Sequence, residues 1–361
     1  MAYPQNMRPR NTGQPGELAL IERIRARATQ AANRSRITST GLNLGIGDDC
    51  ALLRIGAREE LAVTTDLSID GRHFRLDWHP PESVGHRVLA RGLSDLAAMG
   101  ARPVGAFLSL GLPKALVSPV PKNLVENEKK NWVERFFDGF FALAGEFKTP
   151  LAGGDLAESP IALADIVLTG AVERGRALLR SGARPGDQLY VTGTLGGAAA
   201  AFARFAQWAE TGRPPGTGAT PLPIPAQLQR LVAAHLFPRP RIALGARLAR
   251  NQLATAAIDL SDGLSTDLAH LCHESHVGAE IDAAALPIHP GATLEQALHG
   301  GEDYELLFAA PLDARIPARV ADIPLTRIGR IVRTRKGRPP VVLVTTHGAQ
   351  PLAPQGWEHF S

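Results

Sequence analysis

Carboxylates recur in this sequence directly after short apolar runs or inside glycine-rich turns. The residues in this pattern are Asp48, Asp49, Asp66, Asp155, Asp259 and Asp262. Taken alone, an Asp between a strand and a helix is most often an N-cap or a turn residue. The same placement at so many strand ends, however, would bring several acids to the shared rim where α/β proteins bind ligands.

Carboxylates gathered at one rim repel one another unless a cation lies between them. Oxygen ligands without thiolates or paired histidines favour Mg²⁺ over zinc. Because protein-bound Mg²⁺ keeps water ligands and is shared with substrate phosphates, the pattern indicates phosphate chemistry.

The commonest phosphate-binding motifs are missing from the sequence. It contains no Gly-Lys dipeptide, which excludes a Walker A loop, and neither HRD nor DFG, which excludes the protein-kinase pattern. The glycine-rich stretch VTGTLGGAA (191–199) lacks the G-x-G-x-x-G spacing. It therefore predicts a tight turn from a strand into a helix.

Short apolar runs alternate with helical periodicity along the chain. The runs predicted as strands are 61–65, 106–110, 161–172, 188–192, 255–258, 305–309 and 341–345. Apolar residues at helical spacing predict helices over 84–99 and 264–273, and Gly278 is interpreted as a helix stop. The alternation predicts α/β layers in both halves and leaves the order and direction of the strands open.

With 361 residues, the chain is expected to form two domains. We place the boundary near Glu173, with an N-terminal domain over 16–172 and a C-terminal domain over 173–361. Residues 1–15 are expected to be a disordered tail. The Pro- and Gly-rich stretch 211–225 predicts a surface loop.

Composition narrows the function classes. The sequence is 44% hydrophobic and 20% charged, and its net charge of +4 comes from scattered Arg without a dense basic run, which argues against nucleic-acid binding. Residues 1–15 hold no apolar signal segment, and no run of about 18 apolar residues predicts a membrane span. Cys50 and Cys272 have no neighbours at zinc spacing, so a reducing cytoplasm is expected.

Eight segments, in this order, resemble the thiamine-monophosphate kinase family of the aminoimidazole ribonucleotide synthetase superfamily. They are GELALI (16–21), GIGDDCALL (45–53), TTDLSIDGRHF (64–74), LSDLAAMGARP (93–103), LAGGD (151–155), RSGARPGD (180–187), IDLSDGL (258–264) and GGEDYEL (300–306). The resemblance implies two α/β domains, with the N-terminal sheets pairing across a homodimer. It also implies ATP-dependent phosphorylation of thiamine phosphate to thiamine diphosphate.

The resemblance further implies roles for single positions. Those that would hold Mg²⁺ ions are Asp49, Thr64, Thr65, Asp66, Asp95, Asp155, Asp259 and Asp262. Those that would contact ATP are Gly154, Asp155, Arg180 and Ser261, and those that would contact thiamine phosphate are His73, Glu302 and Trp357.

Three of these positions also have a plainer interpretation from the residues alone. His73 could be an exposed loop residue, and Trp357 a packing anchor near the chain end. Asp95 could be half of an exposed ion pair with Arg91 at i, i+4.

The stretches 114–130 and 211–225 are longer than the family pattern, which leaves the adenine-contacting residue open, with Asp138 as a candidate. Residues 67–70 also depart from the usual aliphatic pair, within an otherwise intact segment.

The acceptor in this reaction is a phosphate monoester whose second pKa is near 6, so its oxygen is already an anion at neutral pH and requires no general base. We expect direct in-line transfer of the γ-phosphoryl group, assisted by Mg²⁺. Arg180 and Asp66 are the residues expected to have catalytic roles, with Arg180 offsetting negative charge.

Two other functions are compatible with the fold that the resemblance implies. A relative of selenophosphate synthetase would carry a reactive Cys and Lys near its N-terminus, but no Cys precedes Cys50 and the first Lys is Lys114. A non-catalytic nucleotide sensor of the same fold would have lost some of the Mg²⁺ carboxylates, and the sequence retains all of those expected.

Overall fold

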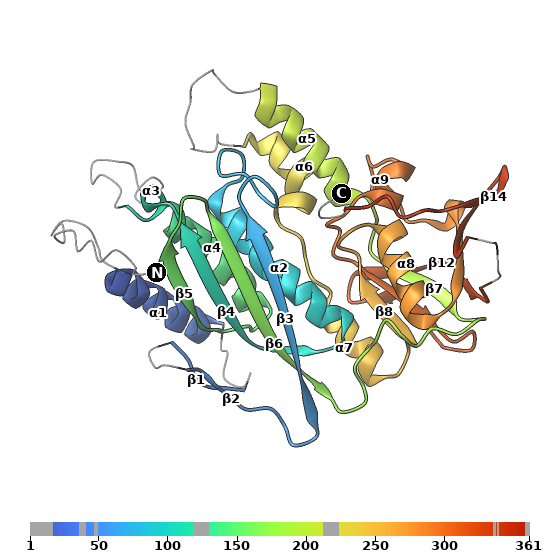
Figure 1. Ribbon diagram of the computed structural model, residues 1–361, viewed down its shortest axis with the longest axis horizontal. Helices are drawn as coiled ribbons and strands as arrows, with labels where there is room; N and C mark the ends of the chain where they lie inside the picture. Colours follow the sequence, from blue (N-terminus) through green and yellow to red (C-terminus); the bar gives the residue numbers. More distant parts are fainter. Residues whose placement is uncertain are drawn as a thin grey trace, which may run out of the picture.

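The computed structural model describes residues 17–35, 41–46, 50–118, 130–211, 224–334, 337 and 339–357 (Figure 1). Within these ranges the chain forms two α/β units side by side, each built on its own sheet. None of the helices in this part of the chain is long and apolar enough to cross a bilayer.

The N-terminal sheet has the strand order β3-β6-β4-β5. Its strands are β3 (Glu59–Ile69), β6 (Leu163–Glu173), β4 (Arg102–Leu112) and β5 (Leu151–Glu158). The β3–β6 and β6–β4 pairs are antiparallel and the β4–β5 pair is parallel. A short antiparallel pair, β1 (Leu42–Leu44) with β2 (Leu52–Leu53), precedes β3.

One face of this sheet is covered by helices. Helix α2 (Pro81–Ala98) packs on the sheet, α4 (Trp132–Glu146) packs on α2, and α1 (Glu17–Arg34) packs on α4. The short helix α3 (Lys114–Val117) follows β4. The apolar core lies between α2, α4 and the sheet, and includes Leu93, Phe136, Phe140 and Leu168. Helix α4 begins at a capping box formed by Asn131 and Glu134.

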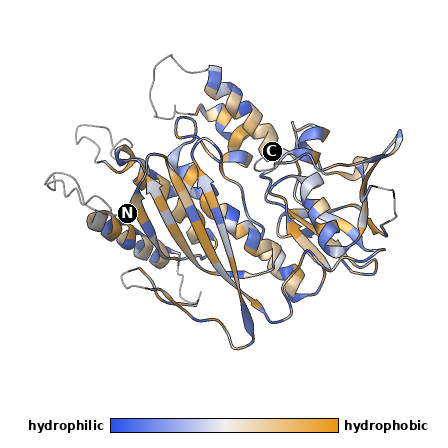
Figure 2. Ribbon diagram, viewed as in Figure 1, coloured by the Kyte–Doolittle hydropathy of each residue, from blue (hydrophilic) through white to orange (hydrophobic). Residues whose placement is uncertain are grey.

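The opposite face of the N-terminal sheet is open, and no helix of the described chain covers it (Figures 1 and 2). Along the edge strand β3, the exposed positions Leu61, Val63, Thr65 and Leu67 alternate with partly or fully buried ones. Leu61, Val63 and Leu67 are 47%, 57% and 45% exposed. An apolar row of this kind on an edge strand indicates a surface that another chain could cover.

The C-terminal sheet has the strand order β14-β13-β9-β12-β7-β10-β8, and β11 pairs with β12. Its strands are β7 (Gln188–Thr192), β8 (Ala256–Asp259), β9 (Gly278–Asp282), β10 (Leu306–Ala310), β11 (Arg319–Val320), β12 (Ile323–Val332), β13 (Val341–Thr345) and β14 (Gly348–Pro351). All pairs are antiparallel except β13 with β9. Helix α8 (Leu264–Ser275), the 3-10 turn η2 (Ala283–Ala285) and α9 (Leu294–His299) complete this unit.

Three further helices join the two units. Helices α5 (Gly197–Thr211) and α6 (Ala226–Leu236) pack together, and α7 (Ile242–Arg250) packs on α2. One apolar cluster contains Ala97 of α2, Leu244 and Leu248 of α7, and Phe308 of β10. Helix α2 therefore contacts the N-terminal sheet and the C-terminal unit at once.

The α/β class and its two layered sheets are confirmed, and each predicted strand overlaps a strand of the structure. Stretch 191–199 is the predicted tight turn, since β7 ends at Thr192 and α5 begins at Gly197. The interpretation of Gly278 is wrong: α8 ends at Ser275, His276 takes the left-handed conformation (φ 54°), and Gly278 begins β9. Residues 212–223 of the predicted loop, 119–129 of the longer stretch and residues 1–15 lie outside the described residues.

Candidate active site

Helix α2 directs a row of polar side chains toward the junction between the two units. Arg87, Arg91 and Asp95 are each four residues apart, and Ser94 directly precedes Asp95. These side chains contact three other segments of the chain, namely the Glu302 loop, β3 and β8, and the contacts define the site.

Acids from three elements meet near α2. The Thr64 hydroxyl of β3 donates a hydrogen bond to the Asp95 carboxylate, and the Ser94 hydroxyl donates to Asp259 Oδ2 at 2.6 Å. Burial raises the pKa of both Asp95 and Asp259. The negative charge of Asp66 raises the pKa of Asp95 further, and the charge of Asp95 does the same to Asp259. Mutual repulsion of this kind shows that the predicted acids of β3, α2 and β8 converge.

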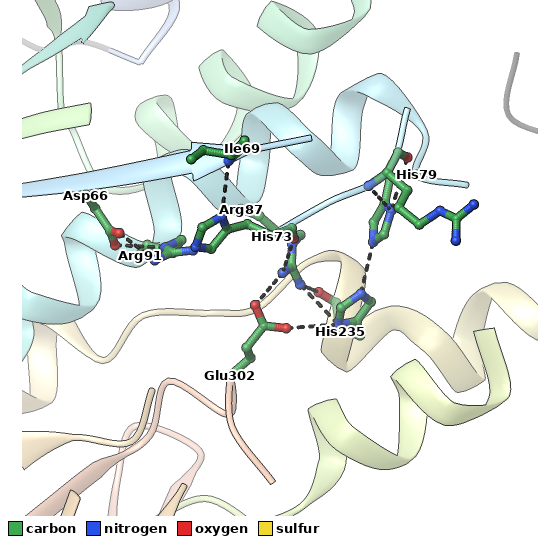
Figure 3. A network of polar contacts seen from close by, with 9 residues as sticks. Asp66, Ile69, His73, His79, Arg87, Arg91, His235 and Glu302 are labelled. Atoms are coloured by element: carbon green, nitrogen blue, oxygen red, sulfur yellow. Dashed lines mark hydrogen bonds and ion pairs between the residues drawn. The ribbon is translucent and has the colours of Figure 1, made fainter. Parts of the chain in front are cut away.

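Asp66 is bound by Arg91 in a bidentate ion pair. Arg91 Nε donates to Asp66 Oδ2 at 2.8 Å and Arg91 Nη2 donates to Oδ1 at 2.5 Å (Figure 3). Both side chains are largely buried, with 17% and 20% exposed. The plainer interpretation of Asp95 as the exposed partner of Arg91 is therefore wrong, because the guanidinium binds β3 instead.

Asp267, which sequence reasoning missed, belongs to the same acidic group. In the first turn of α8 its carboxylate accepts the backbone N–H of Asp262 at 3.1 Å and of Gly263 at 3.0 Å. Burial, together with the charges of Asp259 and Asp262, raises the pKa of Asp267 to about 8. Its position five residues after Asp262, inside IDLSDGLSTD, was the available signal.

The strand register divides the predicted metal ligands between the two faces of the N-terminal sheet. Thr64 and Asp66 of β3 lie on the face that α2 covers, where they meet Asp95 and Arg91. Thr65 pairs with Val167 and Val167 with Phe107, on the open face. Asp155 is linked to Leu67 across the sheet through the paired residues Ser109 and Asp165. Because paired residues point to the same side of a sheet, Asp155 also lies on the open face. Asp66 and Asp155 of one chain therefore project to opposite sides of the sheet.

The described ranges contain no trio of His, Cys, Asp or Glu side chains arranged closely enough to hold a metal ion. Asp49 lies outside the described residues. The donor set nevertheless has the chemistry of a Mg²⁺ site, since it consists of carboxylate and hydroxyl oxygens. The raised pKa values of Asp95 and Asp259 indicate acids that a cation would stabilise in their charged form.

The residues predicted to contact ATP lie at two places. Arg180 is exposed, and it is near enough to the acidic group for its positive charge to lower the pKa values of Asp95 and Asp259. Ser261 follows this group in the loop between β8 and α8. Gly154 of β5 has φ 151°, and a Cβ there would lie 1.9 Å from the carbonyl oxygen of Leu108, so only glycine fits.

A pocket of about 100 Å³ adjoins Gly154 and Asp155. Its walls are mainly apolar and include Ile21, Ile24 and Phe137. The neighbouring candidate Asp138 is bound by Arg27 at 2.5 Å and by Lys130 at 2.7 Å.

The loop that carries Glu302 is built against the loop that carries Ser261 and Asp262. Glu302 N–H donates to the Ser261 carbonyl at 2.8 Å, and Tyr304 N–H donates to the Leu260 carbonyl at 2.9 Å. Glu302 and Tyr304 both have left-handed conformations, with φ values of 68° and 50°. A Cβ on Gly301 would lie 2.6 Å from the Ser261 carbonyl oxygen, so the close approach requires glycine.

Trp357 joins the same loop. The backbone N–H of Trp357 donates to the Asp262 carbonyl at 3.1 Å, while the Trp357 side chain is 52% exposed. An exposed indole does not fit the interpretation of Trp357 as a buried packing anchor.

His73 and Glu302 are bridged by Arg87, a residue that the sequence analysis did not single out. Arg87 Nη2 donates to Glu302 Oε1 at 2.5 Å and to the His73 carbonyl at 3.2 Å (Figure 3). Ile69 N–H donates to His73 Nδ1 at 3.1 Å, which fixes the ring. Burial alone would raise the pKa of Glu302, but the Arg87 guanidinium and His235 outweigh it and hold this pKa below its usual range. The sequence signal that could have identified Arg87 is its charge within the helix predicted over 84–99, four residues before Arg91.

Comparisons with known proteins match both units of the chain. The chain matches the family described as AIR synthase related protein, N-terminal domain, over residues 47–172, and its C-terminal domain over 184–341. Thiamine-monophosphate kinase of Escherichia coli K12 is 37% identical over 360 residues, covering 96% of this chain and 98% of the relative.

Two solved structures share the fold. The crystal structure of thiamine-monophosphate kinase from Stenotrophomonas maltophilia K279a is 39% identical with a TM-score of 0.72, covering 91% of this chain and 97% of that one. The structure of AaThiL complexed with AMPPCP and TMP is 29% identical with a TM-score of 0.68, covering 96% and 97%.

Proposed function

The chain belongs to the thiamine-monophosphate kinase family, and we propose on this premise that it transfers the γ-phosphoryl group of ATP to thiamine phosphate, giving thiamine diphosphate. One structural observation carries the proposal: side chains of the same helix, α2, contact both the acidic group and the pair His73 and Glu302, in positions for a nucleotide phosphate and an acceptor. The relative AaThiL has been solved with AMPPCP and TMP together.

The chemistry required of the protein is mainly positioning. The acceptor oxygen of a phosphate monoester is ionised near neutral pH, so transfer needs alignment and charge compensation rather than a base. Arg180 is the cation that we assign to the transferring phosphate, because its charge already acts on Asp95 and Asp259. His73, Glu302 and the exposed indole of Trp357 are assigned to thiamine phosphate.

We assign Mg²⁺ to the acidic group, with Asp66, Asp95, Asp259 and Asp262 as carboxylate ligands and Thr64 as a hydroxyl neighbour. Bound Mg²⁺ would neutralise phosphate charge in the transition state. Asp66 is already paired with the Arg91 guanidinium, so Asp66 reaches a metal ion only by exchanging one cation for another.

A homodimer through the open faces of the N-terminal sheets is the assembly that we propose. Leu61, Val63 and Leu67 form an exposed apolar row on the edge strand β3. Thr65 and Asp155 face the same side, away from Asp66. In a dimer, Thr65, Gly154 and Asp155 would therefore serve a phosphate site that includes the partner subunit.

The apolar pocket beside Gly154 suits the adenine ring. Its walls of Ile21, Ile24 and Phe137 would pack against a flat base, and Gly154 and Asp155 of β5 line the same pocket. The cytoplasm is the proposed location, supported by two cysteines that form no disulfide, one exposed and one buried.

The test is a turnover assay with ATP, thiamine phosphate and Mg²⁺, in which thiamine diphosphate is identified directly. We expect product with Mg²⁺ and none in excess chelator. Product formation that persists in chelator would refute the metal assignment. Nucleotide binding without product under any metal condition would favour a non-catalytic sensor instead.

A further inference from the structure

A chain of hydrogen bonds reaches Glu302 from outside the proposed substrate contacts. Arg75 N–H donates to His79 Nδ1 at 3.0 Å, His79 Nε2 lies 3.0 Å from His235 Nε2, and His235 Nδ1 lies 3.2 Å from Glu302 Oε2 (Figure 3). His79 lies in the turn before α2, His235 in α6, and Glu302 in the loop between α9 and β10. His79 and His235 are buried, with 2% and 3% exposed.

The backbone of Arg75 favours one arrangement of protons. His79 Nδ1 lies 3.3 Å from the Arg75 carbonyl oxygen but closer, at 3.0 Å, to the Arg75 N–H, which can only donate. His79 Nδ1 therefore accepts this hydrogen bond, and the His79 proton is on Nε2. That proton is donated to His235 Nε2, so the neutral His235 ring carries its own proton on Nδ1 and donates it to Glu302. Arg87 Nη1 also lies 3.1 Å from His235 Nδ1, but it has the His235 carbonyl as an acceptor at 2.5 Å and does not require Nδ1 to accept.

Both rings are held in the neutral form. Burial lowers the pKa of His79 and of His235, and the positive charge of Arg87 lowers both further. The rings of Phe202 and Phe205 surround His235, with centroid distances of 5.0 Å and 6.1 Å. The two histidines and Glu302, which we call the histidine relay, therefore keep the same tautomers across the neutral pH range.

Glu302 requires such external support because its own backbone does not fix the side chain. It lies in the irregular stretch between α9 and β10, in a left-handed conformation. Arg87 binds Oε1 and His235 binds Oε2, so each carboxylate oxygen has one fixed donor. The Glu302 side chain remains 31% exposed.

We propose that Arg87 and His235 are positioning residues that fix the Glu302 carboxylate for thiamine phosphate, and that His79 sets the tautomer of His235 which makes this contact. The proposal rests on the proposed function, in which Glu302 contacts the acceptor. A carboxylate fixed as an anion suits the cationic ring of a thiamine compound.

Two substitutions of His235 separate positioning from packing. In His235→Asn the side-chain amide can take the place of Nδ1 and still donate to Glu302, whereas in His235→Gln it reaches the place of Nε2 and meets only His79. Both variants lose the ring and its contacts with Phe202 and Phe205. A purely structural role predicts similar effects for both.

We expect His235→Gln to raise the KM for thiamine phosphate about tenfold, the loss of one hydrogen bond to a charged group, with the KM for ATP unchanged. His235→Asn should stay closer to the wild type. In a Glu302→Ala background His235→Gln should add no further change, because it acts through Glu302. Equal KM values for the Asn and Gln variants, or an undiminished effect in the Glu302→Ala background, would overturn the proposal.

A second measurement decides the relay without turnover. Imidazole ¹⁵N spectra of the full chain should show His235 protonated on Nδ1 and His79 on Nε2, and His79→Ala should release the His235 tautomer. A His235 ring protonated on Nε2 in the wild type refutes the relay even if the enzyme is active. A wild type that makes no thiamine diphosphate but shows the expected tautomers refutes the proposed function and leaves Glu302 held as described.

Discussion

The Ser94 hydroxyl and the Asp259 carboxylate are 165 residues apart in sequence and 2.6 Å apart in space. Ser94 is in α2, which packs on the N-terminal sheet, and Asp259 ends β8 of the C-terminal sheet. The hydrogen bond therefore joins the two units at the proposed metal site. Because Ser94 is next to Asp95, this hydrogen bond also sets how closely Asp95 of the N-terminal unit approaches Asp259 of the C-terminal unit.

Asp95 and Asp66 should respond differently to amide substitution. The buried charge of Asp95 is opposed by its neighbours, so Asp95→Asn should melt at the same or a higher temperature in chelator. Asp66→Asn leaves Arg91 without its carboxylate and should cost about 1–3 kcal/mol. Both should lose activity by orders of magnitude and gain less stability from Mg²⁺ than the wild type.

Melting temperature with and without Mg²⁺, and turnover, should be measured on the same proteins, with Asp262→Ala included. Variants that melt lower in chelator and turn over normally would show that these acids are structural only.

Arg180→Lys keeps the positive charge but removes the planar fork of donors. Because Arg180 is exposed, the substitution should leave the melting temperature unchanged. We expect a lower kcat, with Arg184→Lys as the matched control in the same segment. Turnover of the Lys variant equal to that of the wild type would remove Arg180 from the transfer step.

The ion pair between Arg87 and Glu302 is sheltered, since the Arg87 side chain is only 5% exposed. Glu302→Ala should therefore cost about 3–5 kcal/mol, because it leaves a buried guanidinium unpaired. The double variant Arg87→Met with Glu302→Ala should be more stable than Glu302→Ala alone. Denaturant unfolding measures both, and simple additivity of the two losses would contradict the expectation.

His86 should make stability pH-dependent. Burial lowers its pKa to about 4, and its Nε2–H donates to the Pro238 carbonyl at 2.8 Å. Between pH 6.5 and 4 the unfolded chain binds a proton that the folded chain does not, so stability falls as the pH falls, by about 1.4 kcal/mol per unit at most.

His86→Gln keeps a donor but does not titrate in this range. The stability difference between wild type and variant should be flat above pH 7 and shift in favour of the variant toward pH 4. Parallel stability curves over the whole range would rule out a depressed pKa at His86.

The open sheet face should govern assembly. Val63→Asp with Leu67→Asp puts two charges in the apolar row of β3 and should convert a dimer to monomers in sedimentation velocity. Leu312→Asp, at a position 74% exposed on the C-terminal unit, is the control and should change nothing. An unchanged sedimentation coefficient in the double variant would exclude this face as the interface.

Local pattern was enough to predict several of the strands. The run 188–192 coincides with β7 and the run 341–345 with β13, because uninterrupted apolar residues bounded by turns are typical of buried strands. Strand β5 was not predicted, since its Gly-rich, largely exposed sequence has no strand pattern. Its place in the sheet depends on pairing with β4, which is a tertiary effect.

The resemblance named individual residues of the site but not what they contact. Nothing in the sequence placed Arg91 beside Asp66, 25 residues away, rather than beside Asp95 on its own helix. His79 and His235 were likewise unremarkable, since their pairing requires α6 to fold back on the turn before α2. Long-range contacts of this kind follow from the assembled fold and not from spacing.

The polar row of α2 places a strict condition on the helix itself. Arg87, Arg91, Ser94 and Asp95 bind the Glu302 loop, β3 and β8 through one continuous set of backbone turns. Inserting or deleting one residue between Arg87 and Ser94 would rotate the residues on one side of the change by about 100° and shift them by about 1.5 Å relative to the rest. Such a change would move Arg87, which holds the acceptor contacts, relative to Ser94 and Asp95 at the acidic group, even if every side chain were retained. Changes in chain length can therefore be absorbed in the surface loops of this enzyme but not in α2.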